Sequence, residues 1–192
     1  GKNGFYYMDG QSNGDKAQAQ ISNDLNNIGN TKIIYENGDS YVGTTKNGNL
    51  FIRDGTGIQN FADGSVYEGD FLDDELTGRG TIKHVDGWTY TGDVVDGIRK
   101  GKGVLKSNSL TTEGDFDDEL LYGEQIYPDG ARYIGEFANG SYHGQGKVVF
   151  NDGETYTGTY KNGEKYGLGT YVWKDGSSYN GYHKDNKKHG FG

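Results

Sequence analysis

The sequence predicts an all-β protein: an elongated, twisted, single-layer antiparallel sheet built from consecutive β-hairpins. Three observations support this prediction. A unit of 23 residues recurs in register along most of the chain. Each unit contains two stretches in which glycine or apolar residues alternate with polar ones, as in half-buried strands. The 192 residues include 35 glycines and 16 tyrosines but only 31% hydrophobic residues, so glycine and tyrosine together must replace an aliphatic core.

The clearest unit spans residues 133–155, and it shows both alternating stretches. In the first stretch, Tyr133, Gly135 and Phe137 point to one face of the expected strand. In the second stretch the alternating residues are Gly144, Gly146, Val148 and Phe150. We number positions from the first tyrosine, so that Tyr133 is position 1 and Phe150 is position 18. Because a glycine leaves its strand face open, we expect a neighbouring aromatic ring to lie over it.

Each unit also contains the turns that its two strands require. A polar turn, Asn139 and Gly140 in this unit, separates the two stretches, and Asp152 and Gly153 follow the second one. Asn-Gly and Asp-Gly pairs tolerate the positive φ angles of tight reversals. Each unit is therefore expected to form one hairpin that leans on the next, as in other repeat proteins.

The repeats divide the chain into two predicted regions. Residues 1–40 hold degenerate units that match mainly the second half of the pattern. Residues 41–192 hold the main array, with units at 41–66, 67–89, 90–111, 112–132, 133–155 and 156–178 and a partial unit at 179–192. Both ends fall inside a unit, so we expect a segment of a longer array, with terminal half-units acting as caps as the alternative.

These units resemble the MORN repeat (membrane occupation and recognition nexus). The resemblance rests on Tyr-x-Gly openings at Tyr67, Tyr90, Tyr133, Tyr156 and Tyr179, and the units that open at Tyr67, Tyr133 and Tyr156 continue to a closing Asp-Gly pair. It covers residues 41–192 strongly, except 112–132, and residues 1–40 weakly. The family implies a non-catalytic antiparallel β ribbon that holds protein partners or is attached to an enzyme or a membrane-tethered protein. Its members include radial-spoke heads of cilia, junctional membrane proteins and phosphoinositide kinases.

Composition excludes several classes of protein. The chain has no cysteine, which excludes disulfides, thiolate metal sites and cysteine catalysis. No apolar run approaches the roughly 18 residues of a membrane-spanning helix, and no signal peptide is recognisable. The net charge of −9 argues against a general nucleic-acid binder. We expect an intracellular protein of the cytoplasm or cytoskeleton, and the resemblance implies the cilium axoneme as one setting.

The four histidines do not predict a catalytic or metal site. His143 and His189 both stand at position 11, but two units separate them by about 20 Å, which is too far to share a zinc ion. His84 and His183 stand where other units have aromatic residues, so we expect them to pack as rings. The sequence therefore predicts no catalytic residue, no metal and no cofactor.

Two acidic runs and the Gly-x-Gly pairs also resemble functional motifs only superficially. The runs at 73–75 and 117–119 fall in hairpin turns and lack the spacing of a calcium-binding loop, so we interpret them as solvated turns. The Gly-x-Gly pairs are not followed by a helix or by a Lys-Ser/Thr pair, as phosphate-binding loops are.

Charge differs from unit to unit and indicates the kind of partner. Residues 67–89 carry six acidic and two basic residues, and residues 112–132 carry seven and one. Residues 156–178 and 179–192 are net positive. Because an acidic field attracts basic molecules, we expect a protein partner with a basic or helical segment, or a second copy of the chain in a homodimer.

A single-layer sheet cannot bury both faces, so its aromatic side chains are predicted to offer a binding face. We expect positions 5 and 18 to make most of the contacts. The predicted partner-binding residues are Tyr67, Phe71, Tyr90, Phe116, Tyr133, Phe137, Phe150, Tyr156, Tyr160, Tyr171, Trp173 and Tyr179.

Two other functions remain open at this point. A basic cluster, Arg99, Lys100, Lys102 and Lys106, suggests association with phospholipid membranes, although a net negative field repels anionic lipid. Alternatively, the chain is an accessory region of a larger enzyme, such as a phosphoinositide kinase or a methyltransferase, whose catalytic domain lies outside these residues.

Overall fold

A computed structural model of the chain describes residues 5–12, 15–22, 30–47 and 49–192. It divides into two compact parts, Gly1–Ile98 and Arg99–Gly192. We call these parts the first unit and the second unit; each contains several of the repeats. The strands are β1 (Phe5–Ser12), β2 (Asp15–Ser22), β3 (Asn30–Tyr35), β4 (Ser40–Lys46), β5 (Asn49–Asn60), β6 (Val66–Leu72), β7 (Glu75–Lys83), β8 (Thr89–Val95), β9 (Ile98–Lys106), β10 (Thr111–Asp117), β11 (Glu119–Ile126), β12 (Arg132–Ala138), β13 (Ser141–Val149), β14 (Thr155–Lys161), β15 (Glu164–Val172), β16 (Ser178–Lys184) and β17 (Lys187–Lys188).

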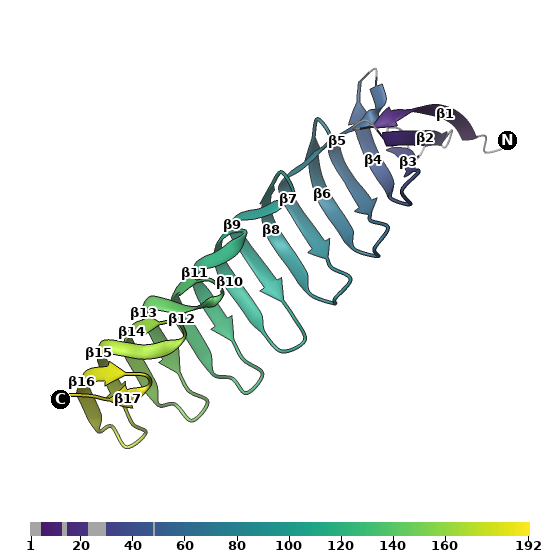
Figure 1. The fold of residues 1–192 in the computed structure, drawn as a ribbon. Coiled ribbons are helices and arrows are strands. Elements are labelled where there is room, and N and C mark those ends of the chain that lie inside the picture. Colours follow the sequence, from purple (N-terminus) through teal and green to yellow (C-terminus); the bar gives the residue numbers. More distant parts are fainter. Residues whose placement is uncertain (1–4, 13–14, 23–29, 48) are drawn as a thin grey trace. The chain divides into compact units, whose positions relative to one another are not determined.

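Within each unit, every strand pairs antiparallel with its neighbours in the sequence (Figure 1). In the first unit the pairing runs from β1 to β8. In the second unit it runs from β9 to β17. The predicted all-β architecture of consecutive antiparallel hairpins is confirmed. The described residues include no helix long and apolar enough to cross a membrane. Residues 1–4, 13–14 and 23–29 of the predicted degenerate region lie outside the described residues.

The hairpin of β12 and β13 shows how the sequence closes each turn. Asn139 and Gly140 both have positive φ angles, 49° and 70°, as a two-residue turn between Ala138 and Ser141 requires. At Gly144 the chain again takes a positive φ, 55°, and there the pairing register shifts by a β-bulge. Tyr142 at position 10 pairs with Phe137 at position 5 directly across the turn, so the two positions lie on the same face.

The core consists of tyrosine rings lying over glycines, as the sequence predicts. Tyr133 is fully buried, and a Cβ atom added to Gly146 would lie 2.3 Å from its hydroxyl oxygen. The Tyr133 hydroxyl donates a hydrogen bond to the backbone carbonyl of Glu136 at 2.8 Å. Tyr67 makes the equivalent bond to Asp70 at 3.0 Å, and burial raises the pKa of Tyr67 to about 12. The ring thus fills the space that glycine leaves while its hydroxyl group stays satisfied.

The ring at position 5 joins successive hairpins within a unit. In the first unit, Phe71 meets Tyr41 and Tyr67 edge-to-face at centroid distances of 5.0 and 5.3 Å. In the second, Tyr160 meets Tyr133 and Tyr156 in the same way at 5.3 and 5.4 Å. Aromatic pairs favour this geometry. Each hairpin is therefore stabilised by contacts with its neighbours as well as by the rings within it.

Candidate partner-binding face

The structure divides the twelve predicted partner-binding residues into two groups. Eight are buried within their sheets: Tyr67, Phe71, Tyr90, Phe116, Tyr133, Phe137, Tyr156 and Tyr160. Four are half-buried: Phe150, Tyr171, Trp173 and Tyr179. Partner binding by any of them stays a prediction, but only the second group presents substantial ring surface.

The expectation for position 5 needs correction. Phe71, Phe116, Phe137 and Tyr160 stand at that position, and each is at most 6% exposed. These rings are covered because side chains of the paired strand and of neighbouring hairpins pack on them, which alternation within one strand does not reveal. Position 18 differs, because Phe150 and Trp173 remain half-buried there.

The buried rings are covered by a position that the repeat pattern does not single out. It is position 10, the residue that pairs across the hairpin with position 5, as Tyr142 pairs with Phe137 and Lys165 with Tyr160. We call it the cover position. The cover residues are Arg53, Leu76, Arg99, Leu120, Tyr142, Lys165 and Lys188. Their type varies from unit to unit, so no recurring residue marks the position in the sequence.

In the second unit, two cover residues and the four half-buried rings form a surface that we call the ring–lysine face. It consists of Lys165, Lys188, Phe150, Tyr171, Trp173 and Tyr179. The Lys165 ammonium nitrogen lies 5.2 Å from the ring centroid of Phe150 and 4.8 Å from that of Tyr171. The Lys188 nitrogen lies 4.4 Å from the Trp173 ring and 4.6 Å from the Tyr179 ring. These are cation–π distances, so the lysines and rings hold one another in place.

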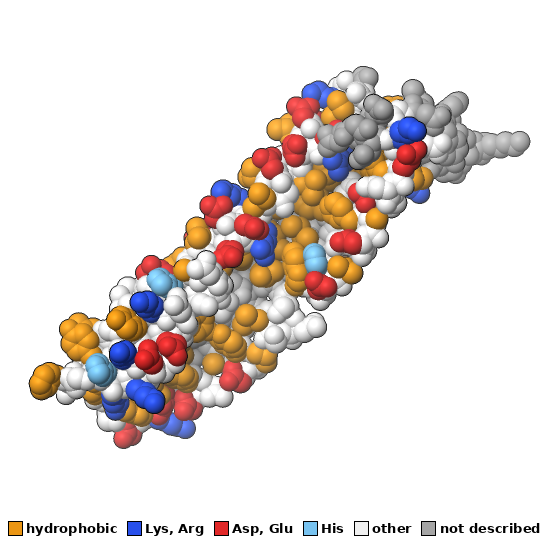
Figure 2. All heavy atoms as spheres, viewed as in Figure 1, with side chains coloured by type: hydrophobic (Ala, Val, Ile, Leu, Met, Phe, Trp, Pro, Cys, Tyr) orange, Lys and Arg blue, Asp and Glu red, His pale blue; other side chains and the backbone are white. Residues whose placement is uncertain are grey.

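The rings of this face also contact each other. Tyr171 lies 5.8 Å from Phe150 and 5.1 Å from Trp173, between ring centroids. The Tyr171 hydroxyl donates a hydrogen bond to the Glu154 carboxylate. A shallow hollow beside Trp173 is lined by Glu154, Lys174, Asp175 and Ser177. In Figure 2, hydrophobic side chains gather along the hairpins of each unit between margins of charged side chains.

Titratable groups around the face respond to burial and to the two lysines. Burial lowers the pKa of Lys165, and burial with the nearby Glu154 raises the pKa of Tyr171 to about 12. His183 is 5% exposed. Its pKa is lowered first by burial and then by the positive charges of Lys165 and Lys188. The surroundings of the two lysines therefore disfavour additional positive charge.

The histidines show packing roles. His183 meets Tyr156 and Tyr179 edge-to-face at 4.9 and 5.3 Å, and His84 stacks on Trp88 at 4.5 Å. The prediction that His84 and His183 pack as rings is thus confirmed. Among the described residues there is no group of three or more His, Cys, Asp or Glu side chains that could hold a metal ion.

In the acidic run at 73–75 the predicted solvated turn holds for Asp73 and Glu75, which are exposed, but not for Asp74. Asp74 is 6% exposed, and it lies against Arg53, which is 8% exposed. Its carboxylate accepts hydrogen bonds from the Arg53 Nε at 3.2 Å and from the Arg53 backbone N–H at 2.7 Å. Arg53 also donates to Gln59 at 3.0 Å and lies 5.2 Å from the Phe71 ring centroid. Sequence reasoning missed this ion pair because residues inserted before Gly55 obscure the cover position.

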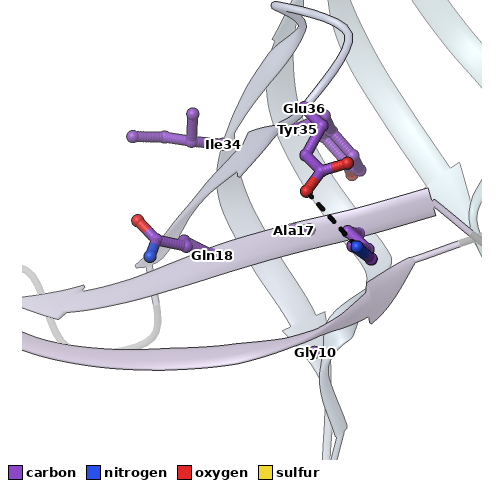
Figure 3. A pocket seen from close by; sticks show the side chains of 7 residues that line it. Gly10, Ala17, Gln18, Ile34, Tyr35 and Glu36 are labelled. Atoms are coloured by element: carbon purple, nitrogen blue, oxygen red, sulfur yellow. Dashed lines mark ion pairs between the residues drawn. The ribbon is translucent and has the colours of Figure 1, made fainter.

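A second hollow lies in the first unit (Figure 3). It is lined by Gly10, Lys16, Ala17, Gln18, Ile34, Tyr35 and Glu36. Lys16 and Glu36 approach each other to 4.0 Å, but both side chains are at least 70% exposed, so their ion pair contributes little. The hollow offers fewer fixed rings and charges than the ring–lysine face.

Comparison with known proteins identifies the repeat. The family model described as MORN repeat matches residues 67–89, 90–112, 133–155 and 156–178. No curated protein sequence matches the chain significantly. Among solved structures, the wild-type TCP10 domain of Danio rerio CPAP, in complex with a peptide of Danio rerio STIL, is similar with a TM-score of 0.35 and 14% identity. The likeness covers 93% of this chain and 100% of that one, but at this TM-score it says nothing of what the present chain binds.

Proposed function

Because the chain is a MORN-repeat protein over residues 67–178, we propose that it is a non-catalytic scaffold that binds protein partners along the ring-bearing face of its hairpins. One observation carries the proposal: four half-buried rings and two lysines share the ring–lysine face. Rigid aromatic side chains with partly exposed surface are typical of residues that dominate binding energy in protein interfaces.

The side chains of this face are already held in place, so little conformational entropy is lost when a partner binds. The Lys165 and Lys188 side chains lie against rings, and the rings contact one another. Side chains that are already fixed lose less conformational entropy when a partner binds. A helix or an extended segment laid along the hairpins is the form of partner that such a face accommodates.

The acidic repeats extend the proposal to other parts of the array. Residues 67–89 and 112–132 are strongly acidic and would attract basic segments of a partner or a second copy of the chain. An intracellular, cytoskeletal setting, with the cilium axoneme as one example, belongs to the same proposal, because MORN repeats occur in such assemblies.

The basic cluster that suggests membrane association loses part of its support. Three of its cations are paired: Arg99 with Asp118 at 3.3 Å, Lys100 with Asp117 and Lys102 with Asp115. Carboxylates beside these side chains offset the charge that an anionic membrane would attract. The structure thus favours a protein partner over a lipid surface.

A pull-down experiment with paired variants tests the proposal. Phe150→Ala combined with Trp173→Ala removes ring surface from the ring–lysine face, and we expect partners captured by the wild-type chain to be lost. Tyr182→Ala is the matched control, because Tyr182 is 51% exposed and lies on the opposite face of its strand. Circular dichroism should be unchanged in both variants. Equal capture by all three proteins would contradict the proposal.

A further inference from the structure

A recurring contact links several cover residues to the turn of the following hairpin. The turn of the following hairpin donates a backbone hydrogen bond to the cover residue's carbonyl oxygen. Asp74 donates to Arg53 at 2.9 Å, and Asp118 donates to Arg99 at 2.8 Å. Asn186 donates to Lys165 at 3.3 Å. At these three cover residues the turn residue carries a polar side chain, whose charge decides whether the cover side chain has an internal counter-ion.

Both arginine cover residues have a carboxylate at this place. Arg53 pairs with Asp74 at 3.2 Å, and Arg99 pairs with Asp118 at 3.3 Å. Lys165 instead has the neutral amide of Asn186. The Asn186 Oδ1 accepts the Lys165 backbone N–H at 2.9 Å, just as the Asp74 carboxylate accepts that of Arg53. The geometry of the contact is kept, but the negative charge is missing.

Lys165 consequently lies among aromatic rings without a counter-ion. Its ammonium nitrogen is within 5.2 Å of the centroids of Phe150, Tyr156 and Tyr171. Neither Lys165 nor Lys188 has a carboxylate partner in the part of the chain that the structure describes. The attraction between a cation and an approaching anion is stronger when the cation is partly removed from water and has no counter-ion than when it is exposed.

We propose that the ring–lysine face binds an acidic amphipathic segment of a protein partner, whose carboxylate side chain supplies the charge that Asn186 lacks. The carboxylate binds between Lys165 and Lys188, and the segment's apolar side chains pack on Trp173 and Tyr171. This inference rests on the proposed scaffold function and specifies the chemistry of its partner at this face. Residues 156–192 carry six basic and three acidic residues, which complements such a segment.

A protein segment fits this face better than an anionic membrane does. The four rings provide apolar surface beside the two charges, as needed for a carboxylate flanked by apolar side chains. The chain's net charge of −9 opposes approach to a negatively charged bilayer, whereas a short peptide meets mainly the local field.

Fluorescence anisotropy with a labelled probe peptide tests the inference on the complete chain. The probe alternates glutamate with leucine and phenylalanine, and matched probes have glutamine or lysine in place of glutamate. We expect the glutamate probe to bind at least about tenfold more tightly than the glutamine probe, the ratio that one charge-assisted hydrogen bond supplies. The lysine probe should bind weakest, and raised salt should weaken binding of the glutamate probe.

Two variants locate the effect. Lys165→Gln should lower affinity for the glutamate probe about tenfold. Asn186→Asp keeps every ring and both lysines but supplies the internal carboxylate that Arg53 has, so it should also weaken that probe. Lys161→Gln is the matched control, because the Lys161 nitrogen lies 5.3 Å from the Tyr166 ring centroid on the opposite face of the same hairpin. It should leave binding unchanged.

The outcomes separate this inference from the scaffold function. Equal binding of the glutamate and glutamine probes, or no effect of Lys165→Gln and Asn186→Asp, overturns the acidic-partner inference while leaving ring-mediated binding intact. The inference also fails if no probe binds, or if the chain binds phosphatidylserine vesicles but not the glutamate probe. Loss of partners on ring removal, tested separately by pull-down, decides the scaffold function itself.

Discussion

The buried pair of Arg53 and Asp74 allows a quantitative test of how the first unit is stabilised. Replacing Asp74 with alanine removes a carboxylate that accepts two hydrogen bonds from Arg53 and leaves the guanidinium group buried without its counter-ion. Gln59 keeps one contact to Arg53, but it carries no charge.

The expected cost has two parts. Breaking one side of a buried ion pair destabilises a protein by about 3–5 kcal/mol, in line with two charge-assisted hydrogen bonds of about 1.5–3 kcal/mol each. Asp74 also has a φ of 74°, and alanine in the left-handed region costs about 1–2 kcal/mol. Asp118→Ala measures the backbone cost alone. Asp118 also has a positive φ, 61°, but its side chain is 69% exposed, and an exposed ion pair contributes little.

Urea unfolding followed by tryptophan fluorescence measures both variants, since Trp88 reports on the first unit and Trp173 on the second. Trp173→Phe and Trp88→Phe backgrounds separate the two signals. We expect Asp74→Ala to lower the free energy of unfolding of the first unit by about 3 kcal/mol more than Asp118→Ala lowers that of the second. Equal losses, within about 0.5 kcal/mol, would refute the reasoning that burial makes this pair strong.

Three further predictions concern the second unit. The folded-state pKa of His183 lies below its usual value of 6.5, so the unfolded chain binds a proton more readily than the folded chain does. The free energy of unfolding should therefore fall as the pH drops below about 6.5. His183→Phe should flatten this pH dependence in thermal melts from pH 5 to 8. Lys165→Leu removes a partly buried charge, so thermal melting at pH 7 should show a higher midpoint even though probe binding weakens. Gly146→Ala would place a Cβ atom 2.3 Å from the Tyr133 hydroxyl oxygen and should lower the free energy of unfolding in urea by at least about 2 kcal/mol. Gly163 has open space around it but a φ of 85°, so Gly163→Ala should lower that free energy by about 1–2 kcal/mol.

The sequence alone predicts the features that recur. The tyrosine of position 1, its glycine platform and the turn residues Asn139 and Gly140 repeat from unit to unit, and each has a simple steric cause. These features are enough to predict the hairpins and the packing of tyrosine rings over glycines. They also indicate which face carries the rings, because strand alternation is a local property.

Features that depend on contact between hairpins are harder to predict. Phe71 packs against Tyr41 of the preceding hairpin and Phe137 against Tyr142 on the paired strand, so alternation within one strand does not reveal that these rings are buried. The cover position escapes notice because its residue type changes from repeat to repeat. Asp74 is buried only because Arg53, 21 residues earlier, reaches it.

The variability of the cover position has an evolutionary consequence. Its side chains lie over a recurring frame of tyrosine, glycine and turn residues, so substitutions at its exposed members, such as Lys188, alter the surface chemistry of a hairpin while the frame stays the same. In the second unit the cover residues that keep exposed surface are Arg99, Tyr142, Lys165 and Lys188, which present a guanidinium group, a phenol and two amines in order along the chain. Such a series can acquire new specificity one repeat at a time, by single substitutions, without a new fold.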